Sequence, residues 1–236
     1  MLVAAAVCPC PPLLVPDVAA GAAPELDGAR TACSDALAVL AASRPDLLVV
    51  VGPGAEEAPE RYPAGAVGGF RGFGVGLDVR LGAGPGGDDR PLPAPLAVGA
   101  WLLERARWAG APVEGLAVGE RLAPERCAVA GRELAARAGR VALLVLGDGS
   151  ACRSLKAPGY LDDRAAPFDE RAARALGAAD TGALAALDEH LAYELKAAGR
   201  APWQVLAAAA EGAGLEGRLL YEDAPYGVGY FVAAWS

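Results

Sequence analysis

The stretch VALLVLGDGSACRSLKAPGYLDDRAAPFDERAARAL, residues 141–176, decides the fold that the sequence predicts. Its first six residues, 141–146, are apolar without polar alternation, which is typical of a strand buried on both faces of an α/β sheet. The strand ends at a Gly-Asp-Gly-Ser turn, residues 147–150. Ligands of such sheets bind beyond the carboxyl ends of the strands, so the turn is a candidate functional site. The alternative is a tight turn whose glycines serve the backbone alone.

Reactive and polar side chains follow this strand in quick succession, before a helix that we expect to open near residues 167–169. The catalytic role itself is not assigned by the pattern, and the candidates for it are Asp148, Ser150 and Cys152. The residues expected to line a binding cleft beside them, from this stretch and from other strand ends, are Cys8, Cys10, Gly54, Glu56, Arg153, Lys156, Tyr160 and Tyr226.

Two further predicted strands show the same pattern, a continuous apolar run that ends at a turn. Residues 2–7 end at a Cys-Pro-Cys-Pro-Pro segment, and residues 47–51 end at Gly-Pro-Gly, followed by Glu56 and Glu57. Segments whose apolar residues recur at helical spacing alternate with these strands. We therefore predict a single α/β domain over residues 1–236, with a central mostly parallel or mixed sheet flanked by helices. The expected helices cover residues 24–42, 96–109, 124–138, 180–198 and 202–210.

The remaining segments are less regular. Residues 70–81 predict an irregular strand or hairpin, residues 82–95 a surface loop, and residues 113–118 a short strand. Two strands at residues 219–222 and 228–233 are joined by a turn and are expected to close the sheet.

Composition excludes several classes of function. The 236 residues carry a formal net charge of −8 with scattered arginines, which argues against a nucleic-acid surface and an anionic membrane partner. No apolar run is long enough to span a bilayer, and the N-terminus lacks the basic region of a leader. Five cysteines at irregular spacing favour reduced thiols, so we expect a cytoplasmic protein.

Four segments, in chain order, resemble the class III extradiol ring-cleavage dioxygenases, the LigB-type superfamily. They are CPCPPLLVPDV at 8–18, DLLVVVGPG at 46–54, GDGSACR at 147–153 with PFDE at 167–170, and YGVGYFVA at 226–233. In that family the matching patterns are PHPP, a strand ending in PHG, GD-x-SH with a later FD, and a terminal GVGY strand. The resemblance spans nearly the whole chain and implies a LigB-type fold.

The resemblance also implies a mononuclear Fe(II), held by two histidines and a glutamate, with a further histidine as acid/base. The ligand positions fall here on Cys10, Gly54 and Ala197, and the acid/base histidine falls on Ala151. The only histidine of the chain, His190, lies in the predicted helix 180–198, where a solvent-exposed or structural role is expected. The usual iron site is therefore missing, and we expect a dioxygenase-like protein that is not a standard ring-cleaving enzyme.

Three hypotheses remain for such a chain. An enzyme of different chemistry would use Cys8, Cys10 and Cys152, either as ligands of zinc or with one thiol activated by Arg153 or Lys156; the alternative is that these thiols are buried core residues. A pseudoenzyme would bind a small molecule without catalysis. A partner subunit would act within a homo- or hetero-oligomer.

Overall fold

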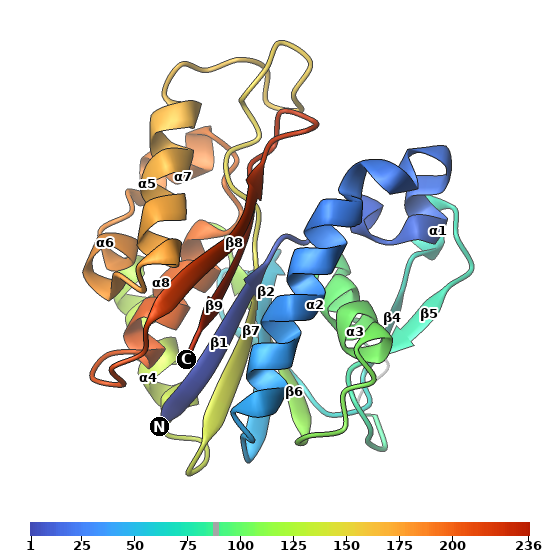
Figure 1. The fold of residues 1–236 in the computed structure, drawn as a ribbon, viewed down its shortest axis with the longest axis vertical. Helices are drawn as coiled ribbons and strands as arrows, with labels where there is room; N and C mark the ends of the chain where they lie inside the picture. The colour runs from blue at the N-terminus through green and yellow to red at the C-terminus, as the bar shows by residue number, and fades with distance from the viewer. Residues whose placement is uncertain (87–89) are drawn as a thin grey trace.

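A seven-stranded mixed sheet forms the centre of the molecule (Figure 1). The computed structural model describes residues 1–86 and 90–236. Its strands are β1 (Leu2–Cys8), β2 (Leu47–Gly54), β3 (Glu60–Tyr62), β6 (Val113–Gly119), β7 (Val141–Leu146), β8 (Gly217–Asp223) and β9 (Tyr230–Trp235). They lie in the order β3-β6-β2-β7-β1-β9-β8. The central strands β6, β2, β7 and β1 are parallel, whereas β9 and β3 run antiparallel to their neighbours.

Helices cover both faces of this sheet. One face carries α2 (Asp27–Ala42) and α3 (Ala94–Arg105), together with α1 (Pro16–Ala19) and a second, two-stranded sheet of β4 (Val67–Gly69) and β5 (Asp78–Arg80). The other face carries α4 (Pro124–Ala135), α5 (Ala165–Gly177), α6 (Thr181–Ala185), α7 (Glu189–Glu194) and α8 (Arg200–Ala209). Short 3₁₀ helices occupy Pro12–Leu14, Ala20–Leu26 and Arg71–Phe73.

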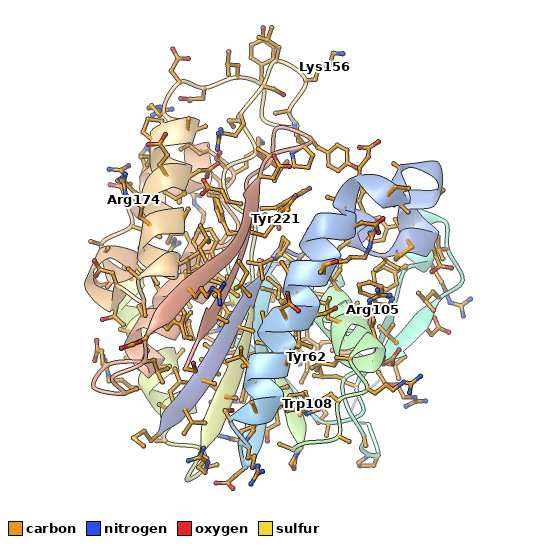
Figure 2. All side chains as sticks on the ribbon, in the orientation of Figure 1. Tyr62, Arg105, Trp108, Lys156, Arg174 and Tyr221 are labelled. Carbon is orange, nitrogen blue, oxygen red and sulfur yellow. The ribbon has the colours of Figure 1, made fainter. Side chains whose placement is uncertain are left out.

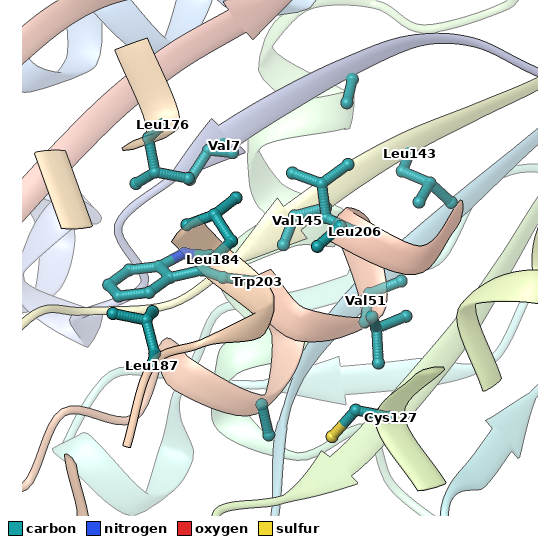
Figure 3. Packing of buried hydrophobic residues seen from close by; sticks show 14 of the residues in the cluster. Val7, Val51, Cys127, Leu143, Val145, Leu176, Leu184, Leu187, Trp203 and Leu206 are labelled. Carbon is teal, nitrogen blue, oxygen red and sulfur yellow. The ribbon is translucent and has the colours of Figure 1, made fainter. Parts of the chain in front are cut away.

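Strand β7 explains why both layers are needed. Its side chains alternate between two hydrophobic cores, with Leu143 and Val145 in the core under α8 and Leu144 and Leu146 in the core under α2 and α3. All of them are buried. Figure 3 shows the first core, in which Val145 lies beside Leu206 of α8. An apolar strand of this kind is stable only between two covered faces.

The predicted α/β class and the mixed central sheet are confirmed, and several predicted boundaries are wrong. The expected helix over 180–198 is two short helices, because the carboxylate of Asp188 accepts the N–H of Leu191 and starts α7 anew. The helix predicted over 96–109 ends at Arg105, and the one over 124–138 ends at Ala135. Part of the expected loop 82–95, residues 87–89, lies outside the described residues.

The irregular strand or hairpin expected over 70–81 takes the form of the β4–β5 hairpin, which begins three residues earlier than predicted. Strand β3 carries no recognisable pattern in the sequence, since it has only three residues. Within the described residues, no helix combines the length and the apolar composition needed to cross a membrane.

Helices α4 and α8 pack so closely that Gly131 has no room for a side chain. A Cβ at Gly131 would lie 2.3 Å from the carbonyl oxygen of Val205 and 2.9 Å from the Cβ of Ala208. We expect Gly131→Ala to lower the free energy of unfolding by about 1–3 kcal/mol, although alanine favours the helix by about 1 kcal/mol. Urea denaturation measures this difference.

The matched control is Gly182→Ala in α6, where the nearest atom, Oδ1 of Asp180, lies 3.5 Å from the added Cβ. This substitution should leave stability unchanged or raise it by up to about 1 kcal/mol. Equal effects of the two substitutions would contradict the close packing of α4 on α8.

Candidate functional site

The chain leaves β1 and β7 toward opposite faces of the sheet. The segment after β1 leads to α2, which packs in one core, and the segment after β7 leads to α5, which packs in the other. Adjacent parallel strands whose connections diverge in this way form a topological switch point, where α/β proteins bind ligands. We call the residues there, Cys10, Glu120, Asp148 and Tyr230, the edge site.

Asp148 joins three elements at this point. Its Oδ1 accepts a hydrogen bond of 2.8 Å from the backbone N–H of Cys10, and its carbonyl oxygen accepts one of 2.8 Å from the N–H of Gly199. Burial raises the pKa of the Asp148 carboxyl to about 7, although the bond from Cys10 opposes that shift. At neutral pH this carboxyl group therefore exists in both forms and can accept or donate a proton.

The negative charge of Asp148 raises the pKa values of two other members of the edge site, Cys10 and Tyr230. The pKa of the Cys10 thiol is raised mainly by burial, then by the charge of Asp148, and further by the charge of Glu120. Burial and then Asp148 also raise the pKa of Tyr230. The structure thus brings together Asp148, a predicted catalytic candidate, and Cys10, a predicted cleft residue. Tyr226 lies beside Glu25, and its pKa is raised by burial and by that glutamate; it also adds to the raised pKa of Tyr230.

Ser150 belongs to a buried network rather than to the open edge. Its N–H and Oγ donate hydrogen bonds of 2.7 and 2.8 Å to the two carboxylate oxygens of Asp169. Arg153 forms an ion pair of 3.0 Å with the same carboxylate. Burial raises the pKa of Asp169, and these bonds oppose that rise. The network fixes the turn that presents Asp148, so Ser150 and Arg153 have structural partners.

The thiols predicted to converge lie in different cores. Cys8 and Cys10 are buried in the core under α2, whereas Cys152 is buried in the other core, with Sγ 3.5 Å from the carbonyl oxygen of Leu195. The pKa of Cys8 is raised by its neighbour Cys33 and by burial, and burial raises the pKa of Cys152. The described residues contain no group of three or more His, Cys, Asp or Glu side chains placed to hold a metal ion.

The remaining predicted cleft residues lie apart from the edge site. Glu56 is exposed in the segment after β2, and Tyr160 is 63% exposed. Figure 2 shows Lys156 at the tip of the segment after β7, pointing away from the protein. Gly54, at the end of β2, is partly exposed.

The residues at the family's iron positions do not fit that metal. A Cβ at Gly54 would lie 2.9 Å from the Cβ of Ala117, so the backbone there is built for glycine. Ala151 and Ala197 are buried methyl groups without a donor atom. The side chain of His190 is 79% exposed on α7, where it pairs with Glu194. A site of two histidines and a glutamate cannot be assembled from these side chains.

Sequence reasoning missed Tyr230, and it considered Arg200 only as a cation for an anionic group at the turn after residue 146. Strand β9 pairs antiparallel with β1, with Val7 opposite Ala233, and this register carries Tyr230 toward Cys10. No pattern in either strand specifies that pairing. Arg200 is buried without a carboxylate, and its guanidinium donates to the carbonyl oxygens of Leu122 and Glu120 and to Gln204. It holds the segment that carries Glu120.

Two hollows in the described surface lie away from the edge site. One, of about 500 Å³, lies beside the β4–β5 hairpin, and the other, of about 680 Å³, lies between α5 and the segment of α6 and α7. Neither is lined by a residue of the edge site.

Comparison with known proteins supports the fold alone. No family model and no curated protein matches the chain. Among solved structures, the chain is similar to the uncharacterized protein JW3007 from Escherichia coli K12, with a TM-score of 0.56 and 13% sequence identity. The match covers 99% of both chains, so the two share their fold over the full length.

The network around Asp169 yields a stability prediction. We expect Asp169→Ala to lower the free energy of unfolding by about 2–5 kcal/mol, because it leaves the buried N–H of Ser150 without an acceptor and Arg153 without its partner. Glu170→Ala, at the next and exposed position of α5, should change it by less than about 0.5 kcal/mol. Similar losses in both variants, measured by urea denaturation, would argue against the network.

Asp148 yields a pH prediction. A carboxyl group whose pKa is raised on folding stabilises the native state below its unfolded pKa of 3.8, and that contribution is lost as pH rises toward about 7. Relative to Asp148→Asn, which cannot titrate, we expect the wild type to lose about 1–3 kcal/mol between pH 4 and pH 8. Urea denaturation of both proteins across that range measures the difference; a difference that does not change with pH would show that the carboxyl titrates normally.

Proposed function

We propose that the chain is a LigB-type dioxygenase-like protein without ring-cleaving iron chemistry, which binds a small hydroxylated molecule at the edge site. We also propose a cytoplasmic location, since all five cysteines are free and buried. The observation that carries the proposal is the position of Asp148 at the switch point between β1 and β7, held by the N–H of Cys10.

The chemistry of Asp148 favours a ligand with hydroxyl groups. A carboxyl group whose pKa lies near 7 accepts a hydrogen bond from a hydroxyl in its ionised form and donates one in its neutral form. It is partly exposed, so a ligand can approach it without unfolding the edge. A cationic ligand is less favoured, because burial disfavours the charged carboxylate that would pair with it.

The protein's side chains favour ligand binding over catalysis by an iron centre or by a cysteine nucleophile. The positions of the iron ligands are taken by Cys10, Gly54 and Ala197, so no step is assigned to iron. The raised pKa values of Cys8, Cys10 and Cys152 keep these thiols protonated at neutral pH, which disfavours a thiolate nucleophile.

A second candidate is a partner subunit of an oligomer. The segment after β7 exposes three large apolar side chains, Leu155, Tyr160 and Leu161. Apolar groups clustered within seven residues of an exposed segment are typical of a surface that another chain covers. Such a partner would cover the tip of the segment after β7.

Titration with catechol, followed by ¹H–¹⁵N NMR under anaerobic conditions, tests the first proposal. We expect shift changes at residues 8–10, 147–150 and 230, and binding at least about tenfold weaker in Asp148→Ala, which loses the polar partner of the ligand. Catechol whose two hydroxyls are methylated should bind more weakly to the wild type. The control is Asp163→Ala, which removes an exposed carboxylate from the same segment, between β7 and α5.

Loading with Fe(II) under the same conditions should leave well under one iron per chain by elemental analysis. One tightly bound iron, or catechol shifts elsewhere in the chain, would contradict the proposal. Absence of catechol binding together with a molar mass above that of one chain would favour the partner subunit instead.

A further inference from the structure

The groove between α5 and the segment of α6 and α7 is a second place where a ligand fits, on the face away from α2. Its volume is about 680 Å³, within the range of small-molecule sites. Its lining includes the apolar side chains of Phe168, Ala175, Leu187 and Leu191, of which the first three are buried. The accessible apolar surface of the groove comes from Leu191, which is partly exposed, and from the exposed Ala178, Ala183 and Ala186, which lie over those buried side chains.

Two arginines stand at this groove on the same face of α5. Arg171 and Arg174 are one helical turn apart, both line the groove and both are exposed. Figure 2 shows Arg174 on the outer side of α5. Of the described acidic residues, none forms an ion pair with either guanidinium. In a chain of net charge −8, two neighbouring cations without a partner are a distinct local feature.

The two carboxylates that line the groove are engaged by the backbone. Asp180 caps α6 by accepting the N–H of Ala183 at 2.9 Å, and Asp188 caps α7 by accepting the N–H of Leu191 at 2.7 Å. Their negative charges compensate the positive ends of those helices. The groove lining therefore carries two guanidinium groups, which lie together on α5, and two carboxylates, which lie at the starts of α6 and α7.

We infer that this groove binds an organic anion with an apolar body, such as an aliphatic carboxylate, independently of the edge site. The apolar part contacts Leu191 and the exposed methyl groups of Ala183 and Ala186. The carboxylate lies between Arg171 and Arg174, whose planar guanidinium groups match a carboxylate with paired hydrogen bonds. Burial of the ligand's aliphatic part and pairing of its carboxylate with the arginines both contribute to the binding free energy, so both parts of the ligand are needed for binding.

Calorimetric titration with decanoate, below its micelle concentration, tests the site. Binding to the wild type should be measurable, and decanol, which lacks the charge, should bind at least about tenfold more weakly. The variant Arg171→Gln/Arg174→Gln should weaken decanoate binding by a similar factor. The matched control, Arg126→Gln/Arg132→Gln, removes the same charge from exposed positions of α4 and should not change it.

A second variant separates the groove from general charge effects. Ala183→Trp places an indole ring at an exposed position of the groove wall without changing charge, and it should also weaken decanoate binding by at least about tenfold. Circular dichroism should show each variant folded. The inference is overturned if decanol binds as well as decanoate, if the α4 control weakens binding as much as the α5 variant, or if Ala183→Trp has no effect.

Discussion

Strand β7 has no polar face, and the arrangement of the molecule follows from the need to cover both of its sides. The strand enters the sheet between β1 and β2, although it follows both by some ninety residues or more of chain. Leu143 and Val145 require one layer of helices, and Leu144 and Leu146 require the other. Because the layers lie on opposite faces, the segments after β1 and β7 must separate. The edge site lies where the segments after β1 and β7 diverge.

A buried carboxylate, Asp169, keeps the edge in shape. It binds the N–H and the hydroxyl of Ser150 and the guanidinium of Arg153, so the turn after β7 cannot shift without leaving charged groups unpaired. Asp148, two residues earlier, is thereby held against the N–H of Cys10. The two aspartates have different roles. Asp169 is fully buried and its hydrogen-bond partners all lie in its own chain, whereas Asp148 is partly exposed and can contact a ligand.

Much of the fold was predictable, because continuous apolar strands between amphipathic helices leave few other arrangements. The three strands at 2–7, 47–51 and 141–146 are found within β1, β2 and β7. What could not be predicted depends on contacts between distant segments. Tyr230 reaches the edge site only through the antiparallel pairing of β9 with β1, and Cys152 lies in the core opposite to that of Cys8, on the side to which the segment after β7 leads. The groove of α5 has no sequence signal, since its arginines look like any exposed pair on a helix.

The position of β1 has a consequence for how the chain is made. Both of its neighbours come from far downstream: Ala5 pairs with Leu143 on one side and with Trp235 on the other. A chain emerging from the ribosome therefore holds an apolar strand with two open edges until β7 has been synthesised, and with one open edge until β9 follows. Contacts of such long sequence separation fold slowly and leave strand edges exposed to other chains in the meantime. The prolines that follow Cys8 limit how far a foreign strand can extend along that edge.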